Sequence, residues 1–246
     1  MGIASLHPSY ALNPKRIERG LGRANYRQMA VPSHLNNSQE RTMGFYNDII
    51  LPRLCDLAMR NKQLLPFRER VIGAAEGRVL EIGVGSGRNL PFYRAPVREV
   101  MALEPAPRLI MMARRASRAT SMPISFIEAS AEAIPLDQHS VDTIVTTLTL
   151  CSIPHADVAL ADMRRVLRPG GKLLFVEHGL APDEAVRWWQ HRLTPVWRRF
   201  SGGCHLNRPI RSLIEGAGFS IDRIETGYIP GPKPMTFMYE GNARPK

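Results

Sequence analysis

Long apolar runs are missing from this 246-residue sequence. A helix needs about 20 consecutive apolar residues to cross a lipid bilayer, and no stretch approaches that length. The first 30 residues lack the apolar segment of a secretory signal, and Leu6 stands where an N-myristoylation signal needs Ser or Thr. We therefore expect a cytoplasmic protein without a membrane span, an export signal or an acyl anchor.

Cysteine is also scarce. The three cysteines, Cys55, Cys151 and Cys204, are far apart and odd in number, so they show neither a disulfide framework nor the paired spacing of a zinc site. Free cysteines persist in a reducing compartment, which agrees with a cytoplasmic location. The sequence predicts no metal site, and we interpret Cys151 and Cys204 as small packed residues.

Acidic residues are too few to balance the basic ones. Lys and Arg number 33 against 22 Asp and Glu, a formal net charge of +11. The excess lies at the ends, because residues 1–70 hold 11 basic against 5 acidic side chains and residues 181–246 hold 10 against 6. Such ends could attract nucleic acid or anionic lipid. Since the arginines are spread singly, we interpret most of them as solvated surface charge.

Two regions of the chain differ in composition and in hydrophobic periodicity. Residues 1–42 are polar, basic, interrupted by proline and without periodicity, which predicts a mobile N-terminal extension. From Met43, which could itself be the true start, helical apolar spacing begins, and Pro52 should bend or restart that helix. Hydrophobic residues make up 44% of the chain, enough for one sizeable core. We therefore predict one domain over residues 43–246.

Apolar runs and amphipathic segments alternate from Arg78 onwards. This alternation is typical of βαβ units and predicts an α/β fold with a mostly parallel sheet. The expected strands are Arg78–Ile82, Glu99–Leu103, Ser125–Glu128, Thr143–Thr147, Lys172–Val176, Ser220–Thr226 and Met235–Tyr239. The expected helices are Phe67–Ala75, Ala106–Ala119, His155–Leu167, Glu184–Trp197 and Pro209–Ala217, with another after Gly87.

A glycine-rich turn follows the first expected strand. Residues 79–93 read VLEIGVGSGRNLPFY, with Glu81 two positions before Gly83, which Gly85 and Gly87 follow. Glycine lets the backbone turn tightly and lets a ligand approach closely. A nicotinamide enzyme would carry the spacing GxGxxG under a pyrophosphate. The acid at Glu81 instead suits a ligand end with positive charge.

Two further elements suit an adenosine group. Glu104 ends the next strand, where a carboxylate can accept hydrogen bonds from both ribose hydroxyls. Ser130, Ala131 and Glu132 follow the third strand, where an adenine edge would lie. The Ser130 hydroxyl would bond an adenine amino group more weakly than a carboxylate does, and it could equally be ordinary turn polarity.

Five segments occur in the order found in class I S-adenosylmethionine-dependent methyltransferases, and the chain resembles that family from Leu80 to Glu177. The segments are LEIGVGSG, LEP, ASAEAIP, SVDTIV and LRPGGKLLFVE. The resemblance implies a Rossmann-like seven-stranded, mostly parallel sheet with an antiparallel last strand and helices on both faces. It also implies S-adenosylmethionine as cofactor, with Gly83–Gly87 under its methionine part and Glu104 on its ribose.

A missing motif and a second resemblance narrow the choice of methyl acceptor. Enzymes that methylate a nucleobase amine usually show an Asn/Asp-Pro-Pro-aromatic run after the fourth strand, which residues 146–154 lack, so nucleic acid is an unlikely partner. GRNLPFY, TLTLCSIP, FVEHG and GGCHLNR are similar to the methyltransferase-like group whose animal members methylate alkyl thiols. Bacterial relatives are often labelled as quinone-pathway C-methyltransferases or phospholipid N-methyltransferases.

Three polar side chains are the candidates for the acceptor pocket. His178 follows the fifth strand, at the edge where open α/β sheets bind ligands, and an imidazole can take a thiol proton near neutral pH. His205 stands beside it as a second candidate. Arg208 could lower a thiol pKa or hold an acidic substrate group. The alternative for each is a purely structural role.

All three tryptophans fall within residues 188–197, in an apolar helical stripe surrounded by arginines. The stripe either packs on the sheet or forms a basic-rimmed lid that admits a hydrophobic substrate or touches a membrane surface. Pro195 argues against one continuous helix.

Together these features predict an enzyme that methylates a small apolar molecule, with a thiol as the first choice of acceptor. A quinone precursor or a phospholipid is the second choice. A cofactor-binding module without catalysis, acting through nucleic acid or lipid, is the third. The sequence does not give the oligomeric state.

Overall fold

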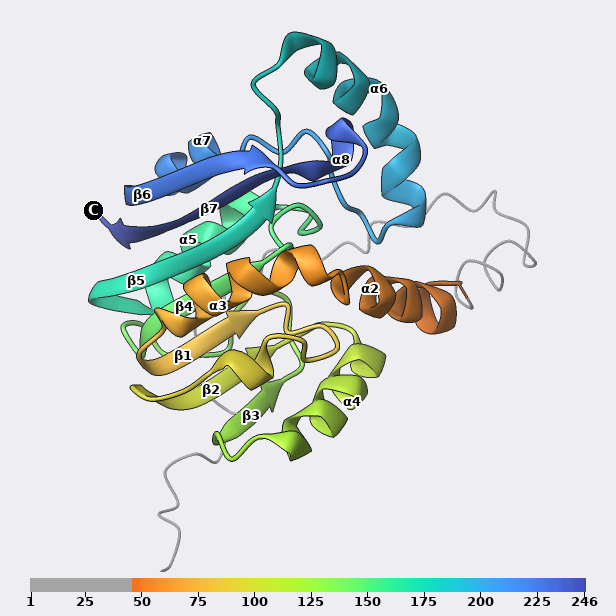
Figure 1. The fold of residues 1–246 in the computed structure, drawn as a ribbon. Helices are drawn as coiled ribbons and strands as arrows, with labels where there is room; N and C mark the ends of the chain where they lie inside the picture. The colour runs from red at the N-terminus through yellow and green to blue at the C-terminus, as the bar shows by residue number, and fades with distance from the viewer. Residues whose placement is uncertain (1–45) are drawn as a thin grey trace, which may run out of the picture. The chain divides into compact units, whose positions relative to one another are not determined.

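The computed structural model describes residues 46–246. The extension expected over residues 1–42, and Met43, lie outside the described residues. One seven-stranded sheet runs through the described part in the order β3-β2-β1-β4-β5-β7-β6 (Figure 1). Strands β1 to β5 pair in parallel, whereas β7 is antiparallel to both neighbours. The strands are β1 (Gly77–Ile82), β2 (Val97–Leu103), β3 (Ile124–Ile127), β4 (Val141–Thr147), β5 (Leu167–His178), β6 (Phe219–Tyr228) and β7 (Phe237–Pro245).

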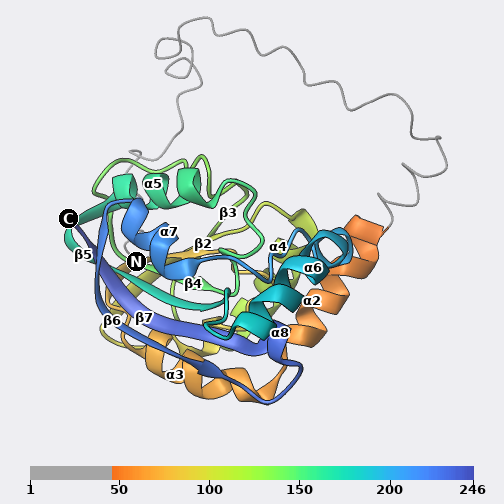
Figure 2. The same cartoon turned by 90° about the horizontal axis from the view of Figure 1, so that it is seen from above.

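Helices cover both faces of this sheet (Figure 2), so the predicted Rossmann-like α/β architecture is confirmed. α3 (Leu65–Gly73) and α4 (Pro107–Ala116) pack on one face, and α5 (Ala156–Val166) and α7 (Ile210–Gly216) on the other. The central strands β1 and β4 are buried on both sides over most of their length, which is why they read as continuous apolar runs. The face with α5 and α7 is held by a core around Phe175, and the face with α3 and α4 by a core around Val145.

The remaining helices lie at the carboxyl-terminal edge of the parallel strands or connect elements. α2 (Leu51–Met59) and α6 (Glu184–Phe200) both lie at that edge, where the carboxyl-terminal end of α6 approaches α2 (Figures 1 and 2). The Tyr46 hydroxyl donates a 2.5 Å hydrogen bond to the Phe200 carbonyl, which ties the two together. Within residues 46–246, no helix is both long and apolar enough to cross a lipid bilayer. The shorter elements are the π-helix η2 (Tyr46–Ile50), the 3-10 helices η3 (Lys62–Leu64), η4 (Leu90–Phe92) and η5 (Ser117–Ala119), and α8 (Lys233–Thr236).

Two proline-containing segments differ from the sequence-based expectation. The helix expected after Gly87 is only the 3-10 turn η4, because Gly87 has a φ of +83° and Pro91 has no N–H to continue a ladder. The last strand begins at Phe237 instead of Met235, since the preceding residues form α8 with proline in its first turn.

Two other prolines, Pro52 and Pro195, lie within helices. Pro52 lies in the first turn of α2, so the helix restarts there as expected. Pro195 lies inside α6, which nevertheless runs unbroken to Phe200, contrary to the expected interruption. Next to it, the Thr194 hydroxyl donates to the Gln190 carbonyl at 2.6 Å.

Candidate active site

Three alternate residues of the turn after β1 are glycines with a positive φ angle. Gly83, Gly85 and Gly87 have φ of +69°, +55° and +83°, which residues with side chains rarely adopt. A Cβ at Gly83 would lie 2.5 Å from the Thr149 side chain, and one at Gly87 would press on Ala113 of α4. A Cβ at Gly85 would meet only the Gly83 carbonyl, at 3.9 Å. Gly83 and Gly87 therefore allow close packing, whereas Gly85 leaves an open backbone surface for a ligand.

Glu104 stands beside this open surface, directly after β2. Its buried carboxylate accepts hydrogen bonds from the backbone N–H groups of Gly85 (3.0 Å) and Ala106 (3.1 Å). Burial raises the pKa of Glu104, while the two backbone donors act in the opposite direction. The acid and the glycine turn, both predicted from the sequence, are therefore in direct contact.

Glu81 is the second buried acid of the site, with a side chain only 1% exposed. Its Oε1 accepts from Asn89 Nδ2 at 2.9 Å, and Asn89 in turn accepts from Arg68. Its Oε2 is buried without a hydrogen-bond partner of good geometry. Burial raises the pKa of Glu81 to about 7, although Tyr93 and Asn89 favour the charged form. A cationic ligand group would stabilise that charged form.

Ser130, Ala131 and Glu132 lie at the same edge of the sheet, after β3. The Ser130 hydroxyl donates to Glu132 Oε2 at 3.0 Å and accepts from the Glu132 N–H at 3.2 Å. Glu132 Oε1 accepts from the His155 N–H at 2.8 Å, and Ala131 is buried. The polar atoms of this turn are thus bonded locally, two strands away from the glycine turn.

Asp56 on α2 is a site residue that sequence reasoning missed. It is buried, accepts from the Ser86 hydroxyl at 2.6 Å and forms ion pairs with Arg88 and Arg60. Burial acts to raise the pKa of Asp56, but the hydrogen bonds from Ser86, Arg60 and Arg88 outweigh it and lower the pKa. These bonds fasten α2 over the glycine turn. The only signal in the sequence was an acid inside an otherwise apolar helical segment.

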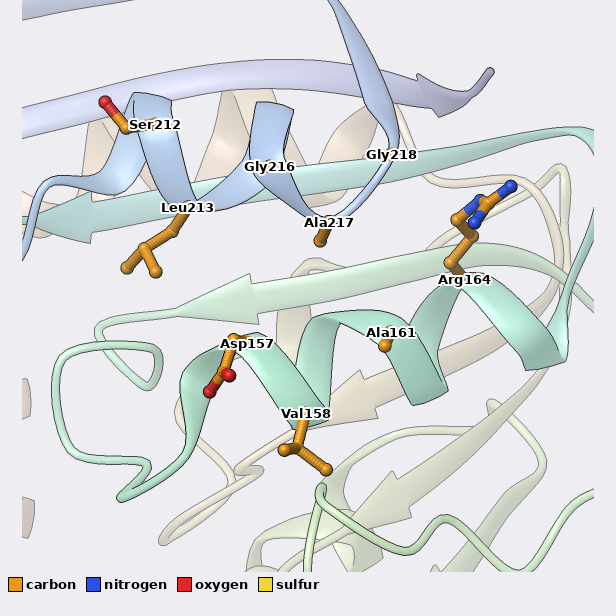
Figure 3. Close-up of a pocket in the computed structure, with 9 residues that line it drawn as sticks. All are labelled: Asp157, Val158, Ala161, Arg164, Ser212, Leu213, Gly216, Ala217 and Gly218. Carbon is orange, nitrogen blue, oxygen red and sulfur yellow. The ribbon is translucent and has the colours of Figure 1, made fainter.

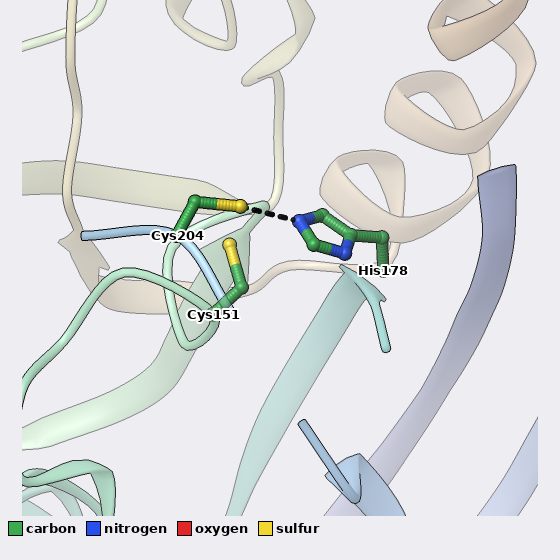
Figure 4. A group of neighbouring side chains, drawn as sticks. All are labelled: Cys151, His178 and Cys204. Carbon is green, nitrogen blue, oxygen red and sulfur yellow. Dashed lines mark hydrogen bonds between the residues drawn. The ribbon is translucent and has the colours of Figure 1, made fainter. Parts of the chain in front are cut away.

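At the end of β5, His178 meets two cysteines from distant parts of the chain (Figure 4). Its Nε2 lies 3.0 Å from Cys204 Sγ, and one donor atom from each of His178, Cys204 and Cys151 lies within 4.8 Å of the other two. Cys151 follows β4, and Cys204 follows α6. We call these three residues the Cys-His-Cys cluster.

The protonation of this cluster follows from its contacts. The neighbouring Cys151 and burial raise the pKa of the Cys204 thiol well above its ordinary range. Burial acts to lower the pKa of His178, but the hydrogen bond with Cys204 and the charge of Glu177 outweigh it and raise the pKa. Burial and Cys151 therefore favour the protonated form of the Cys204 thiol at neutral pH. Cys204, interpreted from the sequence as a small packed residue, places its sulfur within hydrogen-bond distance of His178 Nε2.

His205 and Arg208 lie against the loop that carries Cys151. The His205 N–H donates to the Cys151 carbonyl at 2.8 Å, and Arg208 Nη2 donates to the Ile153 carbonyl at 2.7 Å. Burial and the charge of Arg208 lower the pKa of His205. The structure thus brings these two predicted residues together with Cys151, and the third, His178, together with Cys204.

Thr149 and Cys55 connect the glycine side of the site to the cluster side. The Thr149 side chain packs against Gly83, and its N–H donates to Glu177 Oε1 at 3.1 Å, next to His178. Burial raises the pKa of the Cys55 thiol on α2, with smaller contributions from the neighbouring Glu104 and Cys204. Cys55 is therefore within electrostatic reach of both halves.

This arrangement fits the cofactor that the resemblance implies. S-adenosylmethionine carries a cationic amino group, a ribose and a flexible chain between them. The buried Glu81 carboxylate suits the amino group, the buried Glu104 carboxylate suits the ribose, and the open backbone at Gly85 suits close approach of the chain.

A separate groove of about 570 Å³ lies between α5 and α7 (Figure 3). It is lined by residues such as Asp157, Arg164 and Leu213. It includes no residue of the glycine turn or the Cys-His-Cys cluster, so the candidate active site is at the strand ends instead.

Comparison with known proteins identifies the family of the chain. A family model described as a methyltransferase domain matches residues 80–175. Thiol S-methyltransferase TMT1A of Homo sapiens is 32% identical over 183 residues, 72% of this chain and 73% of the human protein. Thiol S-methyltransferase TMT1B of Rattus norvegicus is 36% identical over 155 residues, 61% of this chain and 63% of the rat protein, so the chain spans less than two thirds of that relative. Demethylmenaquinone methyltransferase of Thermus thermophilus is 31% identical over 127 residues, 49% of this chain and 58% of that protein.

A solved structure shows the same fold. The SAM-dependent methyltransferase of Methanosarcina mazei superposes with a TM-score of 0.57 at 19% identity, covering 68% of this chain and 92% of that one. Sheet order, matched domain and relatives agree, and the chain belongs to the class I S-adenosylmethionine-dependent methyltransferases, as an enzyme that takes its methyl group from that cofactor.

Proposed function

We propose that this methyltransferase transfers its methyl group to a small apolar thiol. The observation that carries the proposal is the Cys-His-Cys cluster at the end of β5, which presents sulfur-binding groups beside the glycine turn. The names of the human and rat relatives point to the same class of acceptor.

We assign the cofactor to the glycine side of the site. Bound S-adenosylmethionine supplies a methyl group on a positively charged sulfur. Glu104 would accept from the ribose hydroxyls, Glu81 would face the amino group, and Ser130, Ala131 and Glu132 would border the adenine. The backbone of Gly83, Gly85 and Gly87 would lie under the methionine part.

The acceptor thiol must reach the site as a thiolate, and a free thiol with a pKa near ~8.5 is only a few per cent ionised at neutral pH. During transfer, its sulfur forms a bond to the methyl carbon while the bond from that carbon to the cofactor sulfur breaks. The electron pair of the broken bond stays on the cofactor sulfur, and the acceptor proton leaves to a base or to water. The enzyme must therefore assist ionisation of the thiol.

His178 was predicted to be that base, and its contacts refine the role. The Nε2 atom is already engaged by Cys204 Sγ, which occupies the position that an acceptor thiol would take. We propose that His178 acts within the cluster and not alone. His205 and Arg208 would position the loop of Cys151 through their bonds to its carbonyls.

The surroundings suit an apolar acceptor and a peripheral membrane contact. Trp189, Val196 and Phe200 of α6 are 52%, 58% and 62% exposed, and Leu57 of α2 is 64% exposed. Arginines alternate with these apolar groups on α6. We propose that this apolar, basic-rimmed face rests on an anionic lipid surface from which hydrophobic acceptors enter.

A quinone-pathway acceptor is the second candidate, favoured by the similarity to the demethylmenaquinone methyltransferase. That reaction forms a carbon–methyl bond and has no use for sulfur-binding groups. The Cys-His-Cys cluster therefore favours the thiol.

The test is a methyl-transfer assay with labelled cofactor and a panel of alkyl thiols, quinols, phospholipids and RNA. Thiols should be methylated, and His178→Ala should lower their turnover by about 10²–10⁴-fold. Val158→Ser, on the exposed surface of α5, is the matched control and should leave turnover unchanged. Methylation of a quinol or phospholipid by a protein that ignores every thiol would overturn the proposal.

A further inference from the structure

The Cys-His-Cys cluster has the composition of a metal site. Two sulfurs and one imidazole nitrogen are the ligands preferred by Zn²⁺, which takes Zn–S bonds of about 2.3 Å and Zn–N bonds of about 2.0–2.1 Å in a tetrahedron. Such a tetrahedron puts neighbouring ligand atoms roughly 3.4–3.8 Å apart. The three donor atoms already lie within 4.8 Å of one another, with 3.0 Å between His178 Nε2 and Cys204 Sγ. Shifts of about 1 Å would close the site.

The backbone holds these donors in place. Gly202 and Gly203, with φ of +64° and +84°, form the tight turn that delivers Cys204. A Cβ at Gly203 would approach the Ser152 carbonyl to 3.2 Å, so the two loops pack closely. The His205 N–H bonds the Cys151 carbonyl at 2.8 Å. Three separate parts of the fold thus converge on one point, as a preformed site requires.

We propose that Cys151, His178 and Cys204 bind one Zn²⁺ ion, and that the acceptor thiol occupies its fourth coordination position. Three protein ligands and one open position are the pattern of catalytic zinc. The role of the ion rests on the proposed thiol acceptor, whereas the site itself rests only on the three donors. The sequence-based expectation of no metal site considered spacing along the chain, which hides residues that only the fold brings together.

The metal supplies the ionisation that thiol methylation needs. Coordination of the acceptor sulfur releases its proton to water and leaves a zinc-bound thiolate. That sulfur takes the methyl group, and the electron pair of the broken bond goes to the cofactor sulfur. The product is a neutral thioether, a weak ligand that leaves the ion. Zinc keeps its charge throughout, so no oxidant or reductant is required.

A disulfide between Cys151 and Cys204 is the competing use of the same sulfurs. It would leave His178 without a function, although the imidazole points at Cys204 in Figure 4. Convergence of three donors, and not two, favours the metal.

The experiment measures binding of Zn²⁺ and Co²⁺ to the full-length, chelator-treated and reduced protein. One ion per chain should bind, and Co²⁺ should show the near-ultraviolet absorption of thiolate-to-cobalt charge transfer and the visible bands of tetrahedral cobalt. Cys151→Ser and Cys204→Ser should bind about 100-fold more weakly and lose intensity in the charge-transfer band. Cys55→Ser is the matched control, because it removes the third cysteine of the chain, on α2, and should keep both the ion and the absorption.

Cys204→His guards against loss of folding, since it replaces one zinc ligand by another and should retain most of the binding. The proposal is overturned if the wild-type protein takes up no ion, if Cys55→Ser weakens binding as much as Cys204→Ser, or if the purified chain holds a Cys151–Cys204 disulfide that forms at the redox potential of its compartment. If the ion binds as described but no thiol is methylated, the proposed function fails and the metal site stands. If thiols are methylated equally well after complete metal removal, the catalytic role of the ion fails and the proposed function stands.

Discussion

At the residue scale, the two buried carboxylates of the site differ in what they touch. Glu104 accepts one backbone N–H on each oxygen, whereas Glu81 accepts from the Asn89 side chain and interacts with the Tyr93 hydroxyl. A ribose can bind Glu104 without displacing the glycine turn, because each carboxylate oxygen accepts two hydrogen bonds. A cationic ligand group at Glu81 instead stabilises a charge that burial disfavours. The two acids should accordingly give different experimental signatures.

Glu104→Ala should lower the affinity for S-adenosylmethionine at least tenfold. The substitution removes two hydrogen bonds to the ribose, and a hydrogen bond to a charged group contributes about 1.5–3 kcal/mol. Isothermal calorimetry measures the change. Glu99→Ala is the control, because Glu99 lies on β2, the strand that Glu104 follows, but pairs with Arg78 away from the site. Unchanged affinity in a folded Glu104→Ala protein would contradict the assignment.

Glu81 should make cofactor binding depend on pH. Burial raises its pKa to about 7 in the free protein, and a bound cationic amino group favours the ionised form, so binding expels a proton below about pH 7. Because one pKa unit corresponds to a factor of ten, affinity should fall roughly fivefold to tenfold between pH 7.5 and pH 6. Calorimetry in buffers of different ionisation enthalpy counts the proton. Glu81→Gln should bind more weakly with a flat profile, and the same slope in both proteins would assign the proton to another group.

At the scale of elements, Asp56 of α2 connects that helix to the glycine turn through Ser86. Asp56→Asn should destabilise the protein by about 1–3 kcal/mol, since Asp56 is buried and Ser86 would lose a charged acceptor. Arg60 and Arg88, whose side chains are 59% and 39% exposed, would also lose their ion pairs with Asp56. Urea unfolding measures the loss.

The same substitution should also raise the KM for the cofactor, because the glycine turn loses its fastening to α2. Asp222→Asn is the matched control, a carboxylate that pairs with an exposed arginine on β7. It should stay within about 0.5 kcal/mol of the wild type. A KM equal to that of the wild type in Asp56→Asn would show that α2 does not support the cofactor side.

The exposed faces of α2 and α6 should bind anionic lipid vesicles. Trp189→Ser should weaken co-sedimentation about tenfold, because burying one large apolar side chain contributes roughly 1.5–3 kcal/mol. Added salt should weaken it further by screening the arginines. Val158→Ser on α5, where Val158 is 46% exposed, is the control and should behave like the wild type. Equal loss in both variants would mean that exposure alone, and not this face, drives the binding.

Sequence reasoning predicted the arrangement of the residues that lie in neighbouring strands and turns. Glu81, the three glycines and Glu104 lie within two adjacent strands and their turns, so the order of motifs was enough to predict their contact. It failed for the Cys-His-Cys cluster, where Cys151 and Cys204 come from loops after β4 and α6 that only the sheet order brings together. Asp56 was missed for the same reason, since its partner Ser86 is 30 positions away.

At the scale of the whole molecule, the sheet and its two core clusters are built from residues between Leu64 and Ala243. A chain that begins at Met43 contains all of these residues together with α2. Residues 1–42 are predicted to be an extension that folding does not need. We therefore expect the shortened chain to keep its melting temperature within about 2 °C and to keep its turnover.

A second truncation distinguishes the effect of losing residues 1–42 from the effect of losing α2. A chain that begins at Leu65 keeps both core clusters almost intact but lacks η2, α2 and η3, and with them Asp56 and Cys55. It should bind S-adenosylmethionine much more weakly, because the glycine turn loses its cover and the carboxylate that holds Ser86 and Arg88. Differential scanning calorimetry and cofactor titration of the two chains give the comparison. Precipitation of the Met43 chain, or a fall of its melting temperature as large as that of the Leu65 chain, would show that residues 1–42 are part of the fold.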